Sequence, residues 1–225
     1  MCEEIIDVVI LSNTKDKNFF RMLEKCVLTI KKSERVNTCI TLVESNDALL
    51  DKNIKELLPI DNVIYPQQPF NYNRFLNIGL QACTNKKILF TNNDVFYDND
   101  TLNILSSYLD KYDSVSPWDN NTSSSLHKVR GIYEGYKVRY NVAGYSFMTK
   151  RSVIKSIGGF DERFTFWYAD DDYALSLQKH NFTHALIGNA SVFHGFEQSH
   201  KLFDNKERAE RTYGAKKVFL DKWQK

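Results

Sequence analysis

The first 98 residues alternate short apolar runs with helical spacing, and this alternation constrains the fold more than any other feature of the sequence. The apolar runs are rich in β-branched residues, which is typical of buried strands; they span 5–11, 38–44, 62–65 and 86–91. Between the first two runs, apolar side chains recur three and four residues apart, and this predicts an amphipathic helix; they are Phe19, Leu23, Cys26, Val27 and Ile30. Further helices are predicted over 47–58 and 73–83. Strands that alternate with helices predict a parallel, doubly wound α/β sheet with right-handed crossovers.

After residue 98 the pattern changes. Helices are predicted over 100–112, 150–157, 170–180 and 203–222. Residues 119–125 form a Ser/Asn-rich loop, and residues 131–140 alternate partly, which predicts strands over a site rather than another strand–helix–strand unit. A length of 225 residues suits one sizeable domain. We therefore expect a single domain, 1–225, whose two halves are 1–98 and 99–225.

The composition excludes several classes of protein. Hydrophobic residues make up 42% of the chain and aromatic residues 13%, which is enough for a core and excludes a disordered chain. The formal net charge is only +2, so the overall charge gives no reason to expect nucleic acid or an anionic membrane as a partner. No stretch approaches the ~18 apolar residues that a membrane span needs. The chain is therefore expected to have no transmembrane segment.

Cysteine usage and the first residues predict a cytoplasmic protein. The start, MCEEIIDVVIL, lacks the basic region of a signal peptide, and Asp7 interrupts its apolar run. The cysteines show no metal-ligand spacing and lie among apolar residues, which predicts buried free thiols in a reducing compartment; they are Cys2, Cys26, Cys39 and Cys83.

The C-terminal residues carry a local excess of positive charge. Residues 200–225 hold eight Lys or Arg against four Asp or Glu; the basic residues are Lys201, Lys206, Arg208, Arg211, Lys216, Lys217, Lys222 and Lys225. Such a run is usually a solvated helix face. The alternative is a docking surface for an acidic acceptor or for a membrane, so peripheral membrane contact stays open.

The first glycine of the chain is Gly79, and this excludes two common ways of binding a nucleotide. A Walker A loop and a G-x-G-x-x-G turn both need glycines after an early strand, where backbone amides cradle phosphate. If this sheet binds a nucleotide, a divalent cation is the natural way to hold its diphosphate.

Polar residues follow three of the predicted strands. They are NT at 13–14, ESN at 44–46 and NND at 92–94. In open α/β sheets the carboxyl ends of the strands are where ligands bind. Each group taken alone also fits an ordinary turn, because Asn and Asp bond readily to nearby backbone.

A run of three aspartates, in ADDD at 169–172, opens one of the late helices. Carboxylates in a first helical turn stabilise the helix dipole by ~0.3–1 kcal/mol. Three consecutive Asp also repel one another, so a cation or a basic neighbour is expected to compensate them. His194, in SVFHG, fits a core histidine when taken alone, but together with Asp94 and the Asp run it becomes a candidate metal ligand.

Two longer motifs stand out, NIGLQACTNKKILFTNNDV at 77–95 and GGFDERFTFWYADDDYALSLQ at 158–178. They resemble motifs of the family 2 type glycosyltransferases of the GT-A fold, and the resemblance covers about residues 6–200. In that family an Asn-x-Gly helix precedes a strand ending in Asp-x-Asp, which is similar to NIGLQACTNKKILFTNNDV at 77–95. A second signature, Gly-Gly-Phe-Asp-Glu-x-Phe followed by Glu-Asp-x-Asp and a helix, resembles GGFDERFTFWYADDDYALSLQ at 158–178, and ASVFHG at 190–195 completes the pattern. The resemblance implies a Rossmann-like, mostly parallel sheet flanked by helices, with acceptor-side strands and helices.

The resemblance also implies donor and metal contacts. The implied donor contacts are Asn13 to the nucleobase, Glu44 to base or ribose, and Asn77, Asn92 and Asn93 to the rest of the nucleotide sugar. Asp94 matches the last Asp of Asp-x-Asp and would hold Mn²⁺ or Mg²⁺ on the donor diphosphate. His194 matches a histidine that completes the metal ligands in several members.

The same resemblance implies catalytic and acceptor-side residues. Asp170 matches the general base. The implied acceptor-side residues are Asp161, Glu162, Trp167 and Asp172.

The chain departs from the family pattern at three positions. Asn92 replaces the first Asp of Asp-x-Asp, Ala169 replaces the Glu beside the base, and Leu76 stands where many members carry Arg. A charge pair at ~4 Å is worth ~4 kcal/mol at an effective dielectric of ~20, so the lost carboxylate weakens the metal site. Mg²⁺ on a nucleotide often needs only one or two protein carboxylates, so the site is expected to persist. The Gln-x-x-Arg-Trp motif of processive members is absent, which favours addition of a single sugar.

The implied function is a metal-dependent, inverting glycosyltransferase that moves one sugar from a nucleoside diphosphate sugar, with UDP favoured, to an acceptor hydroxyl. Residues 1–98 would bind the nucleotide sugar, and residues 99–225 would bind the acceptor and carry catalysis. A glycan precursor is the favoured acceptor. Hydroxymethylated bases of DNA are the alternative, which the basic tail with Trp223 permits.

Three rival functions stay open at this point. Asn92 and Ala169 allow a degenerate protein that only binds sugar nucleotides. A two-metal phosphodiesterase could use Asp94, Asp170 and His194 together with Asp172. A sugar nucleotidyltransferase shares the architecture but needs a Gly-rich phosphate loop after the first strand, which this sequence lacks.

Overall fold

The computed structural model describes residues 4–46, 54–121, 131–195 and 205–224, and only the backbone of residues 205–211. Its first half follows the predicted alternation: β1 (Ile5–Ser12), α1 (Lys17–Lys31), β2 (Asn37–Glu44), α2 (Ile54–Leu57), β3 (Asn62–Ile64), α3 (Tyr72–Gln81) and β4 (Lys87–Asn92). Of the helix predicted over 47–58, residues 47–53 lie outside the described part. The strands pair in the order β3-β2-β1-β4 and are parallel to one another, as predicted.

The second half contains β5 (Val95–Tyr97), α4 (Thr101–Tyr108), β6 (Ser114–Asp119), β7 (Ile132–Glu134), β8 (Ser146–Lys150), α5 (Arg151–Ile157), α6 (Ala169–Lys179), β9 (His184–His194) and α7 (Asn205–Trp223). In the described part, the predicted helices are all present, and their ends lie within four residues of the predicted ends. The strands β5, β6, β8 and β9 were not predicted, and the strands expected over 131–140 reduce to β7. The Ser/Asn-rich loop expected over 119–125 begins at the end of β6, and its residues 122–125 lie outside the described part.

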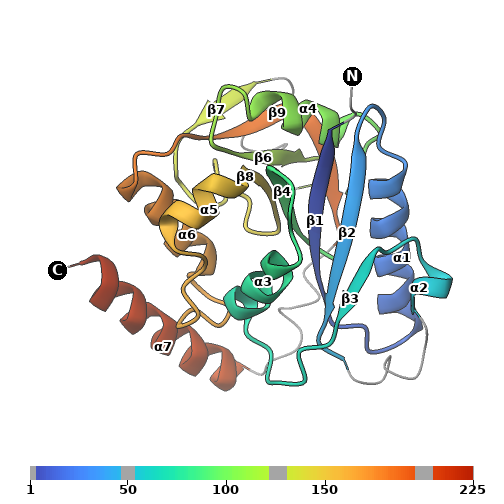
Figure 1. Ribbon diagram of the computed structural model, residues 1–225. Helices are drawn as coiled ribbons and strands as arrows, with labels where there is room; N and C mark the ends of the chain where they lie inside the picture. The colour runs from blue at the N-terminus through green and yellow to red at the C-terminus, as the bar shows by residue number, and fades with distance from the viewer. Residues whose placement is uncertain (1–3, 47–53, 122–130, 196–204, 225) are drawn as a thin grey trace.

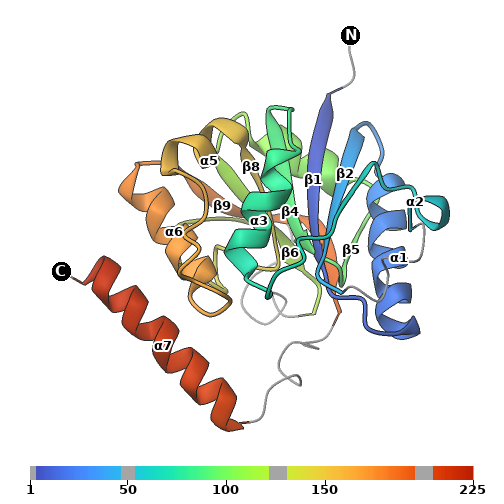
Figure 2. The same cartoon turned by 60° about the horizontal axis from the view of Figure 1, so that its bottom comes forward.

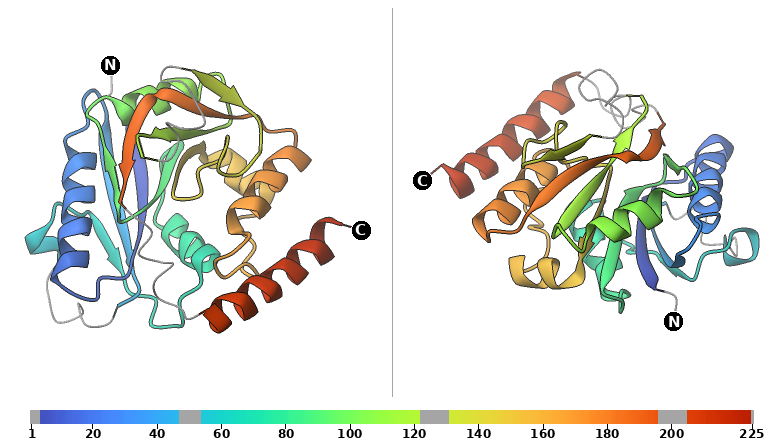
Figure 3. Two further views of the ribbon diagram at one scale, coloured as in Figure 1. Left: turned by 180° about the vertical axis from the view of Figure 1, so that it is seen from behind. Right: turned by 90° about the horizontal axis from the view of Figure 1, so that it is seen from above.

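One nine-stranded sheet runs through the described molecule, with helices on both faces (Figure 1). The order is β3-β2-β1-β4-β8-β6-β9-β5, and β7 pairs with β9. β8 joins β4 and β6 antiparallel, β6 and β9 are parallel, and β5 and β7 are antiparallel to β9. Figure 3 shows the long strand β9 beside β6 and β7. The predicted α/β fold, a large sheet flanked by helices, is confirmed.

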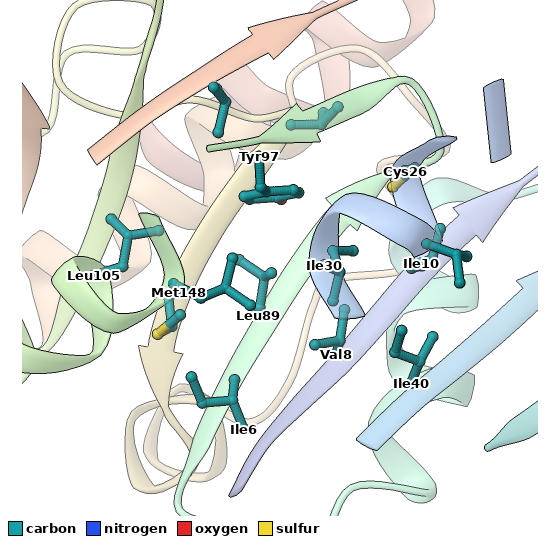
Figure 4. Close-up of a cluster of buried hydrophobic side chains, with 14 of the residues drawn as sticks. Ile6, Val8, Ile10, Cys26, Ile30, Ile40, Leu89, Tyr97, Leu105 and Met148 are labelled. Carbon is teal, nitrogen blue, oxygen red and sulfur yellow. The ribbon is translucent and has the colours of Figure 1, made fainter. Parts of the chain in front are cut away.

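The hydrophobic core forms two clusters, one on each face of the sheet. The first includes Ile6, Val8, Ile10, Leu23 and Leu89, and lies under α1 and α4 (Figure 4). The second lies under α3, α5 and α6 and includes Val9, Leu11, Phe75, Phe90 and Leu177. Successive strand residues point to opposite faces, so β1 supplies both clusters, and this explains why its sequence is continuously apolar.

Local capping and periodicity explain the helices that cover the parallel strands. Asp16 caps α1, because its side chain accepts hydrogen bonds from the amides of Asn18 and Phe19 at 2.7 and 3.2 Å. Asn71 caps α3 by accepting from the amide of Arg74 at 3.0 Å. The apolar face of α1 buries the residues that its spacing selected, Leu23, Cys26, Val27 and Ile30.

Three of the four cysteines lie in the described residues, and all three are free thiols, as predicted. Cys26 and Cys83 are buried, whereas Cys39 is only partly buried. Cys2 lies outside the described residues. Among the described helices, none has the length and apolar character that crossing a membrane requires.

The last helix, α7, lies on the outside of the molecule beside α6 (Figure 2). Its Phe219 ring is 5.0 Å from the Tyr168 ring and 6.4 Å from the Phe164 ring. These contacts connect the end of the chain to the segment that precedes α6.

Candidate functional site

The carboxyl ends of β1, β2 and β4 meet at one edge of the sheet. Their register pairs Ser12 with Glu44 and Leu11 with Asn92. The three polar groups that the sequence places at strand ends are therefore brought together.

Glu44 ties two of these strand ends to each other. Its side chain is 1% exposed and accepts hydrogen bonds from the amide and hydroxyl of Thr14 at 3.0 and 2.9 Å, and from the amide of Asn46 at 2.8 Å. A carboxylate has about four acceptor positions, so these donors occupy most of them. The described contacts give Glu44 a role in shaping the loop, and its predicted contact with base or ribose stays a prediction.

A chain of hydrogen bonds extends from Glu44 to the end of β4. The hydroxyls of Ser12 and Thr14 lie 3.0 Å apart, and the Asn93 amide donates to Ser12 Oγ at 3.0 Å. By contrast, the partly buried side chains of Asn13 and Asn92 have no hydrogen-bond partner within the described part of the chain. These two amides are available to a ligand at the sheet edge.

Asp94 and His194 lie next to each other although 100 residues separate them in the sequence. The pairing of β5 with β9 places His194 opposite Val95, and Asp94 Oδ1 is 3.4 Å from His194 Nε2. This contact lacks hydrogen-bond geometry, and Oδ1 is a buried oxygen without a hydrogen-bond partner in the described structure. A buried carboxylate oxygen without a partner is costly, so it indicates an additional ligand.

Three further contacts fix the His194 side of this pair. The His194 ring stacks on Tyr145, with ring centres 4.2 Å apart and planes 19° apart. Its backbone amide donates to Oδ1 of Asp119, a fully buried residue at the end of β6, at 3.1 Å. The amide of Gly195 donates to the carbonyl of Asp94 at 2.7 Å.

A metal ion at this pair would have few protein ligands. Within the ranges that the structure describes, no group of three or more His, Cys, Asp or Glu side chains could hold a metal. Asp94 and His194 offer one oxygen and one nitrogen, and a cation on a nucleotide diphosphate can take its other ligands from phosphate and water. The unpartnered Asp94 Oδ1 beside the imidazole fits a cation of that kind. The metal role of both residues stays a prediction.

Asp170 lies in the first turn of α6 and follows a strained residue. Tyr168 has a left-handed backbone with φ of 64°, which costs ~1–3 kcal/mol in a residue other than glycine. Its carbonyl accepts from the amide of Asp172 at 2.9 Å and so starts the helix. A Cβ at Gly144 would lie 2.9 Å from both Cβ and Oδ2 of Asp170, so Asp170 can occupy this place only because residue 144 is glycine.

The electrostatic environment of Asp170 suits a proton acceptor. Burial, and then the charge of Asp171, raises the pKa of Asp170 to about 6. Burial also raises the pKa of Asp171, whose amide donates to Asp170 Oδ1 at 3.1 Å. The charge of Arg139 opposes both pKa shifts, so Arg139 is a basic neighbour of the kind that the Asp run was expected to need. A carboxyl group with a pKa near 6 is mostly ionised at pH 7 and is basic enough to accept a proton.

A small cavity of about 10 Å³ lies beside Asp170, and it is about the size of one water molecule. Tyr72 and Gly144 line it together with Ala169 and Asp170, and the Tyr72 hydroxyl donates to the Gly144 carbonyl at 2.7 Å. The cavity therefore borders Gly144, the residue directly before Tyr145.

The predicted acceptor-side carboxylates are engaged within the chain. Asp172 is 3% exposed, and its Oδ1 accepts from Lys222 and Trp223 at 2.7 and 2.8 Å. Asp161 pairs with Arg163 and Lys222, and Glu162 accepts from Arg74 at 2.8 Å and from Asn77 at 3.1 Å. Asp161 and Asp172 therefore have partners within the chain, and the acceptor-side role of these residues stays a prediction. Trp167 is partly buried, with its ring 4.9 Å from the Phe166 ring.

Asn77 is also used inside the protein. Its amide nitrogen donates to the carbonyl of Phe160 at 2.8 Å, and its oxygen accepts from the amide of the same residue at 2.9 Å. Asn71 and Asn73 likewise donate to the carbonyls of Glu162 and Asp161, at 2.8 and 2.9 Å. These asparagines hold the GGFDERF segment against α3, so the structure gives no support to the predicted donor contact of Asn77.

Several residues of this region were not predicted from the sequence. They are Tyr72, Asp119, Arg139, Gly144, Tyr145 and Lys222. Two signals were available in the sequence. The Asp run called for a basic neighbour, a role that Arg139 fills, and an isolated glycine, Gly144, lies just before SFMTK at 146–150, where it often marks a close approach of backbone to another group.

Comparisons with known proteins support the fold. No protein-family model matches the sequence, and no curated protein matches it either. Among solved structures, the chain is similar to S. aureus TarS, a glycosyltransferase, with a TM-score of 0.65 and 10% sequence identity. The match covers 85% of this chain and 36% of TarS, so the chain spans little more than a third of the length of that protein. At this identity the likeness shows the fold, which is a mixed α/β, GT-A-like arrangement.

Proposed function

We propose that this chain is a metal-dependent glycosyltransferase that moves one hexosyl or pentosyl unit from a nucleoside diphosphate sugar to an acceptor hydroxyl with inversion. One observation carries the proposal: the predicted base and the predicted metal ligands contact two consecutive residues, Gly144 and Tyr145. Asp170 packs against Gly144, and His194, beside Asp94, stacks on Tyr145. On a GT-A-like sheet, this arrangement supports a donor diphosphate and a catalytic base on adjacent sides of one segment.

The parallel half supplies the proposed donor site. Asn13 would contact the nucleobase, and the open amide of Asn92 would bond the sugar or ribose together with Asn93. Glu44 would keep the two loops at the spacing that the nucleotide needs, because it bonds to both. UDP is the favoured nucleotide on the family resemblance.

Asp94 and His194 are the residues proposed to hold Mn²⁺ or Mg²⁺. Such a cation, when bound, neutralises charge on the diphosphate leaving group. The contribution of the chain is to present one unpartnered carboxylate oxygen and one imidazole nitrogen, and to hold the imidazole in place through Tyr145 and Asp119.

Asp170 is proposed as the general base. It would take the proton of the acceptor hydroxyl while the hydroxyl oxygen bonds to the anomeric carbon and the bond from that carbon to the diphosphate breaks. Attack from the side opposite the diphosphate inverts the anomeric configuration. The strained Tyr168 and the bare backbone of Gly144 place the carboxylate of Asp170 for this step.

A glycan precursor is the proposed acceptor, within a single domain of residues 1–225 located in the cytoplasm. The DNA alternative rested on the basic tail with Trp223. In the described part of that tail, Lys222 and Trp223 bond to Asp161 and Asp172, so these two residues do not favour nucleic acid.

A screen of nucleotide sugars with and without Mn²⁺ tests the proposal. A ligand at 100 times its dissociation constant stabilises a protein by ~2.7 kcal/mol, which is measurable as a rise in melting temperature. We expect a UDP-sugar to raise the melting temperature only with the metal, and the same donor to release UDP when an acceptor is supplied. Absence of both effects with every nucleotide sugar contradicts the proposal, whereas stabilisation without donor hydrolysis or transfer indicates the degenerate binding protein.

A further inference from the structure

The end of α7 contacts two carboxylates on either side of Tyr168. Lys222 Nζ is 2.8 Å from Asp161 Oδ2 and 2.7 Å from Asp172 Oδ1. Trp223 Nε1 donates to the same Asp172 oxygen at 2.8 Å. One ammonium group thus joins the GGFDERF segment to the first turn of α6, and we call these four residues the α7 clamp.

The α7 clamp is well shielded from water. The side chain of Asp172 is 5% exposed, that of Asp161 18% and that of Lys222 23%. An ion pair with this little exposure holds its geometry better than a surface pair, and loss of one partner leaves a buried charge without compensation. Burial raises the pKa of Asp172, and the hydrogen bonds from Lys222 and Trp223 oppose this rise.

The segment between the two clamped carboxylates contains the strained turn. Tyr168 keeps its left-handed backbone in this segment, and its ring packs on Phe219 of α7 at 5.0 Å. Asp170 follows it by two residues and precedes Asp172 by two. A strained conformation persists only where surrounding contacts determine it, and α7 supplies contacts on both sides of this one.

We propose that Lys222 and Trp223 are positioning residues for the transfer reaction: the α7 clamp holds Asp161 to Asp172 and thereby holds the turn that presents Asp170 to the acceptor. The inference rests on the proposed function, because Asp170 is the base in that proposal. In this proposal, Lys222 and Trp223 at the basic end of the chain position the catalytic carboxylate and do not bind the acceptor.

Substitutions in the full chain test the α7 clamp, with the donor identified by the nucleotide-sugar screen. Lys222→Met removes the charge, and Trp223→Phe keeps an aromatic ring but removes the N–H donor. A misplacement of ~1 Å can cost 10²-fold in rate, so we expect Lys222→Met to lower kcat by about 10- to 100-fold. The Mn²⁺-dependent Kd for the donor should change less than about twofold, and Trp223→Phe should have a smaller effect of the same kind.

Two matched variants separate positioning from general stabilisation. Lys222→Arg keeps a cation whose fork can reach two carboxylates and should recover most of kcat. Lys31→Met makes the same chemical change in the parallel half, where Lys31 lies 3.0 Å from Asp61 and its side chain is 26% exposed. This control should leave kcat at the wild-type level. A wild-type kcat in Lys222→Met, or equal losses in Lys222→Met and Lys31→Met, overturns the inference.

Hydrogen exchange tests the α7 clamp independently of activity. The amide of Asp172 is bonded to the Tyr168 carbonyl at 2.9 Å, so loosening of the turn should speed its exchange in Lys222→Met by at least about tenfold while amides of β2 are unchanged. If the wild-type protein transfers no sugar, the proposed function fails, and this measurement still decides whether the α7 clamp holds the turn. Unchanged exchange at residues 168–173 contradicts the α7 clamp.

Discussion

One sheet contains the parallel strands β3, β2, β1 and β4 and the mixed strands β8, β6, β9, β5 and β7. The two sets of strands differ in some of the groups that stabilise the buried carboxylates near them. In the described parallel half, the buried carboxylates are Asp7 and Glu44. Asp7 accepts from the amides of Thr84 and Asn85 at 2.7 and 2.6 Å, and Glu44 from neighbouring amides and a hydroxyl. All of these donors are neutral.

In the mixed half, the buried Asp119 also accepts from backbone amides, but the three carboxylates in the first turn of α6 lie beside cations from other elements. Arg139 opposes the pKa rise of Asp170 and Asp171, and Lys222 pairs with Asp172. All five histidines of the chain also lie after residue 98. The proposed catalytic carboxylate and the cations beside it therefore lie in the mixed half, where we expect most of the pH dependence, whereas the described buried carboxylates of the parallel half are stabilised by neutral donors.

The largest expected effect is that of Asp170→Asn on turnover. Asparagine keeps the shape and a hydrogen bond but cannot accept the proton, so kcat should fall by ~10²–10⁴ with little change in donor Kd. For the wild type, kcat should also fall as the pH drops below about 6, because the pKa of Asp170 is raised to about 6 and the base must be ionised. Steady-state kinetics across pH and donor titration calorimetry measure these effects.

Asp171→Asn is the matched control for this prediction. It changes the adjacent carboxylate of the same turn and should lower kcat only mildly. If Asp171→Asn abolishes turnover and Asp170→Asn stays active, the base is Asp171 and the assignment of Asp170 is wrong.

The second expected effect is the loss of metal-dependent donor binding in Asp94→Ala. Removing one unit charge near a cation costs ~4 kcal/mol at ~4 Å and an effective dielectric of ~20, so donor affinity with Mn²⁺ should fall by ~10²–10³. Calorimetry with and without Mn²⁺ measures it. Asp98→Ala changes an exposed Asp four residues away and should leave the affinity unchanged. An unchanged Mn²⁺-dependent affinity in Asp94→Ala removes Asp94 from the metal site.

The third prediction concerns the pH dependence of stability. His184 is 2% exposed, lies 2.9 Å from Ser114 Oγ through Nδ1 and 3.0 Å from the Asn141 carbonyl through Nε2, and burial lowers its pKa to about 4. Between pH 6.5 and 4 the unfolded chain binds a proton at this residue that the folded chain does not bind. Stability from this group is therefore lost as the pH falls through that window, by ~3 kcal/mol in total.

Urea unfolding of the wild type and of His184→Gln at pH 7.5 and 5 measures this contribution. The raised pKa values of Asp170 to Asp172 act in the opposite direction with pH, so the difference between the two proteins isolates the histidine. We expect the variant to lose less stability between these pH values. Parallel losses in both proteins would show that His184 does not titrate in this way.

The smallest expected effects come from the same substitution in each half, Gly79→Ala and Gly144→Ala. A Cβ at Gly79 would lie 2.4 Å from Val9 Cγ1 and 3.0 Å from Val43 Cγ2, so overpacking should cost ~1–3 kcal/mol of stability and leave kcat of the folded protein unchanged. A Cβ at Gly144 would displace Asp170 and should lower kcat about tenfold at similar stability. Equal effects of Gly79→Ala and Gly144→Ala on kcat would contradict the assignment of catalysis to the mixed half.

The parallel half could be predicted because its information is local. Its strands are continuous apolar runs, α1 has the 3.6-residue period, and the strand-end residues follow each run directly. In a parallel sheet, strand ends at the same edge must meet, so the grouping of Asn13, Glu44 and Asn92 followed from the pattern alone. The two carboxylates proposed for metal and base, Asp94 and Asp170, were also chosen from the sequence, through motif resemblance.

The mixed strands and the partners of the site were decided only by tertiary structure. β6 and β8 bury Ser114, Ser116, Ser146 and Thr149 completely, so no apolar alternation marks them as strands in the sequence. Lys222 lies 61 residues from Asp161, and Trp223 lies 51 residues from Asp172. No periodic pattern connects positions so far apart. Periodicity reports which face of one element is buried. It does not report which distant charge will compensate a buried carboxylate, because that depends on how the elements pack against one another.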